Sequence, residues 1–206
     1  MYFEKQTPIF LQLGFRQDGL KALKSYIDLL WAENENLNLI SRKMTYEELI
    51  DNHVIDCLLP LSYFPRDKKK VADFGSGGGL PGVLFAIQFP EAEFHLYEKS
   101  PKKQDFLNLC QKLASNIHVH GEIPPQLEGV DLVTARGFKP LDVILEVSRA
   151  YYKKGGSYFL LKARHEKISE EQALAQKKFK DLSIKITPLQ SPVLEVERHL
   201  VQINGF

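Results

Sequence analysis

The sequence predicts an α/β fold in which a mostly parallel sheet ends in an antiparallel hairpin and follows a short N-terminal helical cap. From Val71 onward, β-like apolar runs alternate with helical patterns, which is typical of a parallel sheet covered on both faces. Only the turn at 188–192 separates the last two β-like runs, and so short a link makes them antiparallel. Before residue 65 the apolar pattern is helical.

Residues 1–65 are expected to form the cap and residues 66–206 the sheet domain. The first cap helix is predicted over 17–38, where large apolar side chains recur at helical spacing. The second helix should begin at Thr45, whose hydroxyl can cap the helix while Glu48 reaches back, as in a capping box. It should end at the next proline.

The sheet domain is expected to hold seven strands with helices between them. The strands are predicted, in chain order, at 70–74, 93–97, 117–120, 131–134, 157–162, 182–187 and 193–203. The helices are predicted at 81–89, 101–114, 140–152 and 169–180. In such a sheet, ligands bind beyond the carboxyl ends of the parallel strands, so the residues that end these strands are the candidate site.

The first of these strands runs into a glycine-rich turn, with five glycines in the eight residues 75–82. Glycine lets the backbone turn sharply and press against a ligand, and the turn should offer backbone N–H groups. The segment Gly77-x-Gly79-x-x-Gly82 fits the dinucleotide fingerprint, whereas Asp73-x-Gly75-x-Gly77-x-Gly79 fits the loop of S-adenosylmethionine (SAM) methyltransferases. A carboxylate at Asp73 would repel a pyrophosphate but attract the cationic groups of SAM. We therefore predict a Rossmann-like class I SAM-dependent methyltransferase fold.

Two later strand ends supply further candidate contacts to the cofactor. Glu98 ends the second strand, 19 residues past Gly79, where a carboxylate can accept both ribose hydroxyls. The residues after the third strand could flank the adenine, with Glu122 near its amine. The expected cofactor-binding set is Asp73, Gly75, Ser76, Gly77, Gly79, Leu80, Glu98, Gly121, Glu122, Ile123 and Arg136.

Arg136 is the candidate catalytic residue. Ala135 and Gly137 leave space around it, after the fourth strand and near the mouth of the ligand crevice. A guanidinium there could meet a phosphate or the Hoogsteen edge of a guanine.

The composition of the chain bears on which partners and metals it can be expected to bind. The net charge of +1 does not by itself indicate a nucleic-acid-binding protein, so any such role must rest on local clusters of Lys and Arg. Cys57 and Cys110 are isolated, which indicates neither a metal site nor a disulfide. The chain has no apolar run of membrane-spanning length and no signal-peptide core at its start. We expect a cytoplasmic monomer without a metal.

Six short sequence motifs, spread over most of the chain, point to one protein family. They are Asp73-Phe-Gly-Ser-Gly-Gly-Gly-Leu-Pro-Gly82, Thr134-Ala-Arg136, Leu160-Leu-Lys162, Glu197-Arg-His-Leu200, Asn36-Leu-Asn-Leu-Ile40 and His53-Val-Ile-Asp56. With them the sequence resembles the ribosomal RNA small-subunit methyltransferase G family, also called glucose-inhibited division protein B.

That resemblance implies methyl transfer from SAM to N7 of a guanine in the decoding region of 16S rRNA, with the rRNA or the small ribosomal subunit as partner. Guanine N7 is already a nucleophile, so no general base is expected, and Arg136 would position the base. Arg136, Lys162, Arg198 and His199 are the candidate RNA contacts.

The sequence leaves three other functions open. One is a SAM methyltransferase that acts on a different RNA, a protein or a small molecule. Another is an NAD-binding oxidoreductase, disfavoured by Asp73 and the terminal hairpin. The last is a noncatalytic RNA-binding module.

Overall fold

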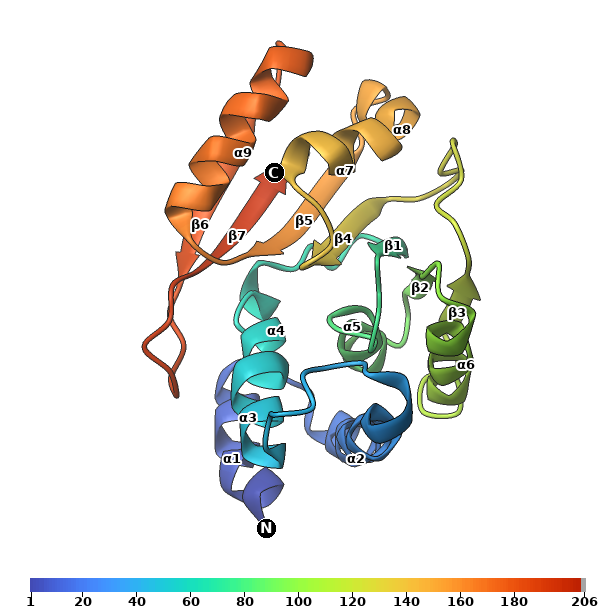
Figure 1. Cartoon of the computed structure of the whole chain (residues 1–206), viewed down its shortest axis with the longest axis vertical. Helices are drawn as coiled ribbons and strands as arrows, with labels where there is room; N and C mark the ends of the chain where they lie inside the picture. The colour runs from blue at the N-terminus through green and yellow to red at the C-terminus, as the bar shows by residue number, and fades with distance from the viewer. Residues whose placement is uncertain (205–206) are drawn as a thin grey trace.

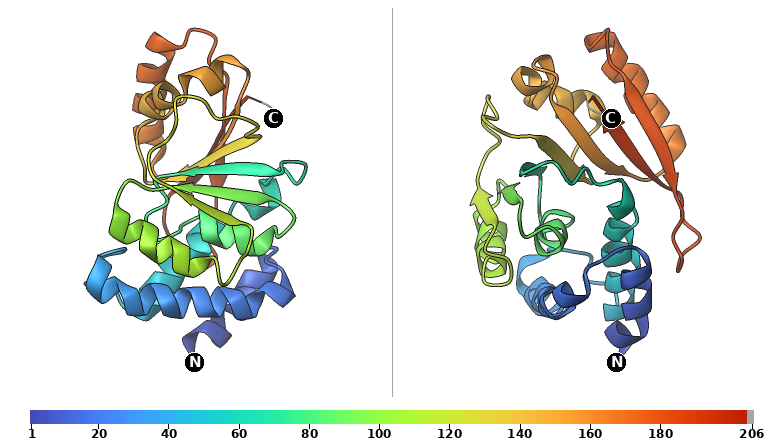
Figure 2. Two further views of the ribbon diagram at one scale, coloured as in Figure 1. Left: turned by 90° about the vertical axis from the view of Figure 1, so that its right-hand side faces the viewer. Right: turned by 180° about the vertical axis from the view of Figure 1, so that it is seen from behind.

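A computed structural model, which describes residues 1–204, places one seven-stranded sheet between two layers of helices (Figures 1 and 2). The strand order is β3-β2-β1-β4-β5-β7-β6, in which β1 to β5 are parallel and β7 runs antiparallel to both β5 and β6. The strands are β1 (Lys70–Phe74), β2 (Glu93–Tyr97), β3 (Ile117–His120), β4 (Leu132–Arg136), β5 (Ser157–Lys162), β6 (Ile184–Leu189) and β7 (Arg198–Ile203). The predicted fold class is confirmed.

The helices divide between the two faces of the sheet. They are α1 (Tyr2–Gln12), α2 (Leu20–Leu37), α3 (Tyr46–Leu49), α4 (Asp56–Leu58), α5 (Gly82–Gln88), α6 (Pro101–Cys110), α7 (Leu141–Val147), α8 (Arg149–Lys153) and α9 (His165–Lys178), with short turns η1 (Gln17–Gly19), η2 (Ile50–Ile55, π-helical) and η3 (Leu61–Tyr63). Helices α7, α8 and α9 cover one face, and α1 to α6 lie on the other (Figure 1). None of the helices among residues 1–204 is long and apolar enough to cross a membrane.

The N-terminal helices share a core with the sheet. One apolar cluster joins Tyr26 and Leu30 of α2 to Val83 of α5, Phe106 of α6 and Phe159 of β5. Helix α2 lies along the outside of α5 and α6, as both views in Figure 2 show. Residues 1–65 are therefore packed into the molecule, and their division from residues 66–206 as a separate unit stays a prediction.

Several element boundaries differ from the predicted ones. Helix α1 was not predicted, because Pro8 interrupts the helical signal in its sequence. Strand β4 continues to Arg136, so this residue lies in the strand instead of after it. Strand β6 includes Pro188, which a sheet tolerates here because β6 is an edge strand. As a result, the hairpin connection is 190–197 and β7 begins only at Arg198. The capping box of Thr45 and Glu48 is confirmed.

Candidate active site

The glycine-rich turn after β1 has the backbone geometry that makes its glycines necessary. Gly75, Gly77 and Gly79 have φ of 67°, 54° and 87°, in the left-handed region that other residues rarely adopt. The cap holds this turn in place, because the buried hydroxyl of Tyr26 on α2 donates a hydrogen bond to the Gly78 carbonyl at 2.6 Å.

The turn uses several of its own N–H groups. The amides of Gly75 and Ser76 donate to the Tyr97 carbonyl at 2.9 and 3.1 Å, and the Gly77 amide donates to Glu98 Oε2 at 3.0 Å. These three amides are not free for a ligand, which limits the expectation that the turn offers its N–H groups, because β2 ends beside the turn and supplies acceptors for them. These bonds join the turn that follows β1 to the end of β2.

Asp73 lies beneath this turn and is 1% exposed. Neither of its carboxylate oxygens has a hydrogen-bond partner within residues 1–204. The nearby Ser76 hydroxyl donates instead to the backbone carbonyl of Asp73 at 3.0 Å. Burial raises the pKa of Asp73 to about 7. A Cβ at Gly82 would lie 2.6 Å from Asp73 Oδ2, so glycine is needed there for the close approach of α5. A buried carboxylate without a partner suits a site that receives a cation.

Glu98 fixes two segments at once. Besides the Gly77 amide, it accepts a hydrogen bond from the Ser100 amide through Oε1 at 2.9 Å, just before α6 begins. A carboxylate has about four acceptor positions, so two remain for the ribose hydroxyls. On the adjacent loop, Glu122 forms an ion pair with Lys99 at 3.3 Å, and both side chains are exposed. Gly121 and Ile123 flank Glu122 directly after β3.

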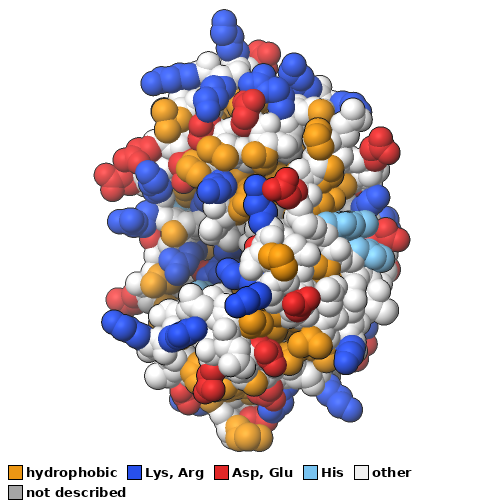
Figure 3. Space-filling view, turned by 45° about the vertical axis from the view of Figure 1, so that its right-hand side comes forward, with side chains coloured by type: hydrophobic (Ala, Val, Ile, Leu, Met, Phe, Trp, Pro, Cys, Tyr) orange, Lys and Arg blue, Asp and Glu red, His pale blue; other side chains and the backbone are white. Residues whose placement is uncertain are grey.

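A cleft of about 590 Å³ opens beyond the carboxyl ends of β4 and β5, next to the start of β7. All four candidate RNA contacts line it, namely Arg136, Lys162, Arg198 and His199. Lys and Arg side chains surround a hollow on the face seen in Figure 3. The structure thus brings together the residues that the sequence scatters over the last third of the chain.

Asp56 joins two of these cations. Its Oδ2 accepts a hydrogen bond from Arg136 Nε at 2.8 Å, and its Oδ1 accepts one from Arg198 Nε. The Nη2 of Arg136 also donates to the Asn52 carbonyl at 3.1 Å and to His53 Nδ1 at 2.7 Å. Burial, followed by the charge of Arg136, lowers the pKa of His53 to about 4, so the ring is neutral and can accept this bond. The π-helical turn η2, a feature frequent at functional sites, carries Asn52 and His53 toward β4.

Lys162 and His199 are largely committed to the protein. Lys162 Nζ donates at 2.8 Å to both Glu171 Oε2 and the Lys139 carbonyl. His199 is 6% exposed, and its Nδ1 lies 2.7 Å from the Ala163 carbonyl. In contrast, the side chains of Lys139 and Arg164 are exposed at the same cleft and form no ion pair within the described residues. These two cations were not among the predicted RNA contacts, although Arg164 lies only two residues after Lys162 in a basic stretch of the sequence.

Phe138 connects the cleft with the glycine turn. It lines the cleft, and its ring also packs against Gly75, where a Cβ would clash with it, and against Phe74 at a centroid distance of 6.1 Å. The candidate cofactor turn and the basic cleft therefore share one wall.

Comparison with known proteins supports one family throughout. The family model of rRNA small subunit methyltransferase G (GidB) matches residues 19–201. The ribosomal RNA small subunit methyltransferase G 1 of Bdellovibrio bacteriovorus is 70% identical over 202 residues, which is 98% of each chain. The ribosomal RNA small subunit methyltransferase G of Brachyspira hyodysenteriae is 35% identical over 185 residues, 88% of this chain and 89% of its own.

Solved structures are similar in fold alone. A putative O-methyltransferase from Klebsiella pneumoniae gives a TM-score of 0.58 at 12% identity, over 87% of this chain and 90% of its own. Aeropyrum pernix fibrillarin in complex with S-adenosyl-L-methionine gives 0.53 at 15% identity, over 73% of each chain. Together with the family match, these similarities explain the glycine turn and the terminal hairpin: the chain belongs to the rRNA small subunit methyltransferase G family of SAM-dependent methyltransferases.

Proposed function

We propose that this chain transfers a methyl group from SAM to N7 of a guanine in 16S rRNA of the small ribosomal subunit. The observation that carries the proposal is the basic cleft of Arg136, Arg198, Lys139 and Arg164, which shares the Phe138 wall with the glycine turn. A nucleotide in this cleft would lie beside a cofactor held at the turn. We include in the proposal a cytoplasmic monomer in which residues 1–65 cap a methyltransferase domain of residues 66–206.

The residues at the turn fit SAM. The buried Asp73 carboxylate lacks a partner within the described chain, and Glu98 keeps acceptor positions for ribose hydroxyls. Gly121, Glu122 and Ile123 would flank the adenine from the loop after β3. When bound, SAM supplies an electrophilic methyl group on a sulfonium centre.

The cleft needs to orient the base more than to activate it. Guanine N7 carries its own lone pair, so no proton has to leave before attack. Arg136 and Arg198 each keep one guanidinium nitrogen, Nη1 and Nη2 respectively, without a hydrogen-bond partner within residues 1–204. These groups can donate to guanine O6 or to a phosphate and leave N7 unobstructed. Lys139 and Arg164, which are exposed, suit the flanking phosphates.

Methyl transfer to ribosomal subunits tests the proposal. Small subunits from a strain that lacks the protein are incubated with labelled SAM and the purified chain, and the rRNA nucleosides are separated. We expect label in 7-methylguanosine and a loss of most of the activity with Arg136→Ala. Lys112→Ala, which removes a cation outside the cleft, is the matched control.

Each other result points to a different function. Label in another nucleoside would replace the N7 target, and label in ribosomal protein would indicate a protein methyltransferase. SAM binding without any transfer would favour a noncatalytic RNA-binding module. Parallel reactions with protein-free 16S rRNA show whether the substrate is the free RNA or the assembled subunit.

A further inference from the structure

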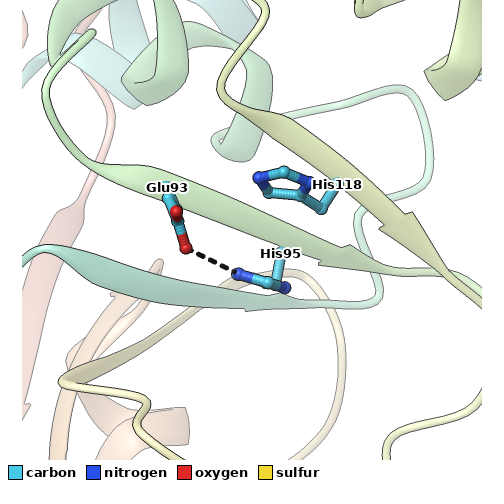
Figure 4. A group of neighbouring side chains, drawn as sticks. All are labelled: Glu93, His95 and His118. Atoms are coloured by element: carbon cyan, nitrogen blue, oxygen red, sulfur yellow. Dashed lines mark ion pairs between the residues drawn. The ribbon is translucent and has the colours of Figure 1, made fainter.

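A cluster of histidines lies at the far edge of the sheet from the cleft. Glu93 and His95 are two residues apart on β2, so their side chains face the same side of the sheet. His118 is the register partner of His95 on the parallel edge strand β3. Figure 4 shows the three side chains on the same side of the two strands, with the Glu93 carboxylate pointing toward the His95 ring. Helices α5 and α6 cover the opposite face, which leaves Glu93 and His118 exposed.

From this arrangement we propose that Glu93, His95 and His118 form a binding site for a divalent transition-metal ion, with Zn²⁺ as its representative. One oxygen and two ring nitrogens lie within 4.8 Å of one another. Imidazole and carboxylate are ligands that Zn²⁺ accepts, and three protein ligands leave a fourth position for water.

The spacing of the first two ligand atoms suits a tetrahedral ion. His95 Nε2 lies 3.5 Å from Glu93 Oε2, which is too long for a good hydrogen bond. Two ligands at about 2.0–2.1 Å from a tetrahedral Zn²⁺ are about 3.4 Å apart. His118 is exposed on an edge strand, so rotation of its side chain can bring its nitrogen to the same ion.

His95 has the surroundings of a metal ligand. Its Nε2 is buried and has no hydrogen-bond partner within residues 1–204. Its other nitrogen, Nδ1, lies 2.8 Å from His120 Nε2, and in the tautomer in which Nδ1–H donates, the Nε2 lone pair is free. His120 is itself stacked on Tyr97 at 4.9 Å, so the partner is held in place. Metal-ligating histidines commonly have their second nitrogen fixed in this way.

The lysine on the neighbouring strand forms a hydrogen bond elsewhere. Lys70 is the register partner of Glu93 on β1, and its Nζ donates to the Glu128 carbonyl at 3.2 Å. A bound ion would join the edge strand β3 to β2 shortly before the strands reach Gly121 and Glu98. The expectation of no metal depended on the isolated cysteines, whereas these three ligands come together only when β2 and β3 pair.

Competition with a chromogenic zinc chelator tests the site on the whole chain at pH 7.5. We expect one equivalent of Zn²⁺ to bind with a Kd in the micromolar range and His118→Ala to raise the Kd at least tenfold. His165→Ala, at the exposed start of α9, is the matched control and should bind as the wild type does. Glu93→Gln should also weaken binding, and its exposed position makes misfolding a poor explanation of the result.

A second measurement separates a specific site from adventitious surface binding. Zn²⁺ should raise the Tm of the wild type but not of His118→Ala, since only the folded site binds the ion. The proposal is overturned if the wild type binds less than one equivalent at 100 µM Zn²⁺. It is equally overturned if His118→Ala and Glu93→Gln both keep the wild-type Kd.

Discussion

Replacement of Asp56 by alanine should loosen the cleft without touching the cofactor turn. The carboxylate is 8% exposed and accepts one charged hydrogen bond from Arg136 and one from Arg198. Asp56→Ala removes both bonds and leaves two guanidinium groups facing each other across the space. The geometry of two candidate RNA contacts thus depends on one side chain of the cap.

The loss of stability follows from burial and charge. A hydrogen bond to a charged group contributes about 1.5–3 kcal/mol, whereas an exposed ion pair contributes less than about 1 kcal/mol. The side chains of Arg136 and Arg198 are 19% and 25% exposed, so each bond falls toward the lower part of the first range. We expect Asp56→Ala to lower the free energy of unfolding by about 3 kcal/mol. For a chain of this size that corresponds to a Tm about 6–12 °C lower.

Urea unfolding measures this loss. Asp67→Ala is its control, because the Asp67 side chain is exposed and its single ion pair among residues 1–204 is with the adjacent Lys68 at 3.5 Å. Methyl-transfer kinetics on the same variant should show a higher KM for the ribosomal substrate, while calorimetry shows an unchanged Kd for SAM. The double variant with Arg136→Ala should lose much less than the sum of the single losses, since the two residues share a bond. Additive losses, or an Asp56→Ala loss below about 1 kcal/mol, would refute the role of Asp56.

Three further measurements probe the proposed cofactor and RNA contacts. Glu98→Ala should weaken SAM binding by about 1–3 kcal/mol through unpaired hydrogen bonds, and an unchanged Kd in calorimetry would remove Glu98 from the site. The pKa of Asp73 is raised to about 7 in the folded protein, above its unfolded value, so folding takes up a proton and this group's contribution to stability falls as pH rises from about 4 to 7. In urea unfolding, this group should lower the free energy of unfolding by up to about 1.4 kcal/mol per pH unit, and Asp73→Asn should remove that decrease. If the pH dependence of the variant equals that of the wild type, the raised pKa of the buried Asp73 carboxyl is contradicted. The KM for ribosomal subunits should rise with salt because Lys and Arg contacts release counterions, and insensitivity to salt would argue against phosphate contacts.

Local rules explain what the sequence predicted well. The Thr45 and Glu48 capping box depends on residues three apart, and it forms as expected. The glycine turn and the terminal hairpin follow from backbone conformation and loop length, which a single segment specifies. The candidate RNA contacts came from the family resemblance, and the structure brings them to one cleft.

The features that were missed depend on pairings between distant segments. Asp56 meets partners 80 and 142 residues away, and no spacing in the sequence indicates that contact. Arg136 was expected near a crevice mouth with open space around it. Instead its side chain is held by the Asn52 carbonyl, His53 and Asp56, because strand β4 extends far enough to bring it against the cap. We therefore expect Arg136 to contribute to stability as well as to base positioning.

Two different helices of the cap form hydrogen bonds with the two parts of the proposed active site. Tyr26 on α2 bonds to the Gly78 carbonyl of the cofactor turn, and Asp56 at the start of α4 bonds to the arginines of the cleft. Both helices also contribute to the apolar core beneath the sheet, so they cannot move away from it without exposing buried side chains. A segment fixed in this way does not act as a lid that opens over the substrate. It holds the cofactor turn and the basic cleft at a constant separation, which is the requirement of a transfer reaction that depends on orientation without a general base.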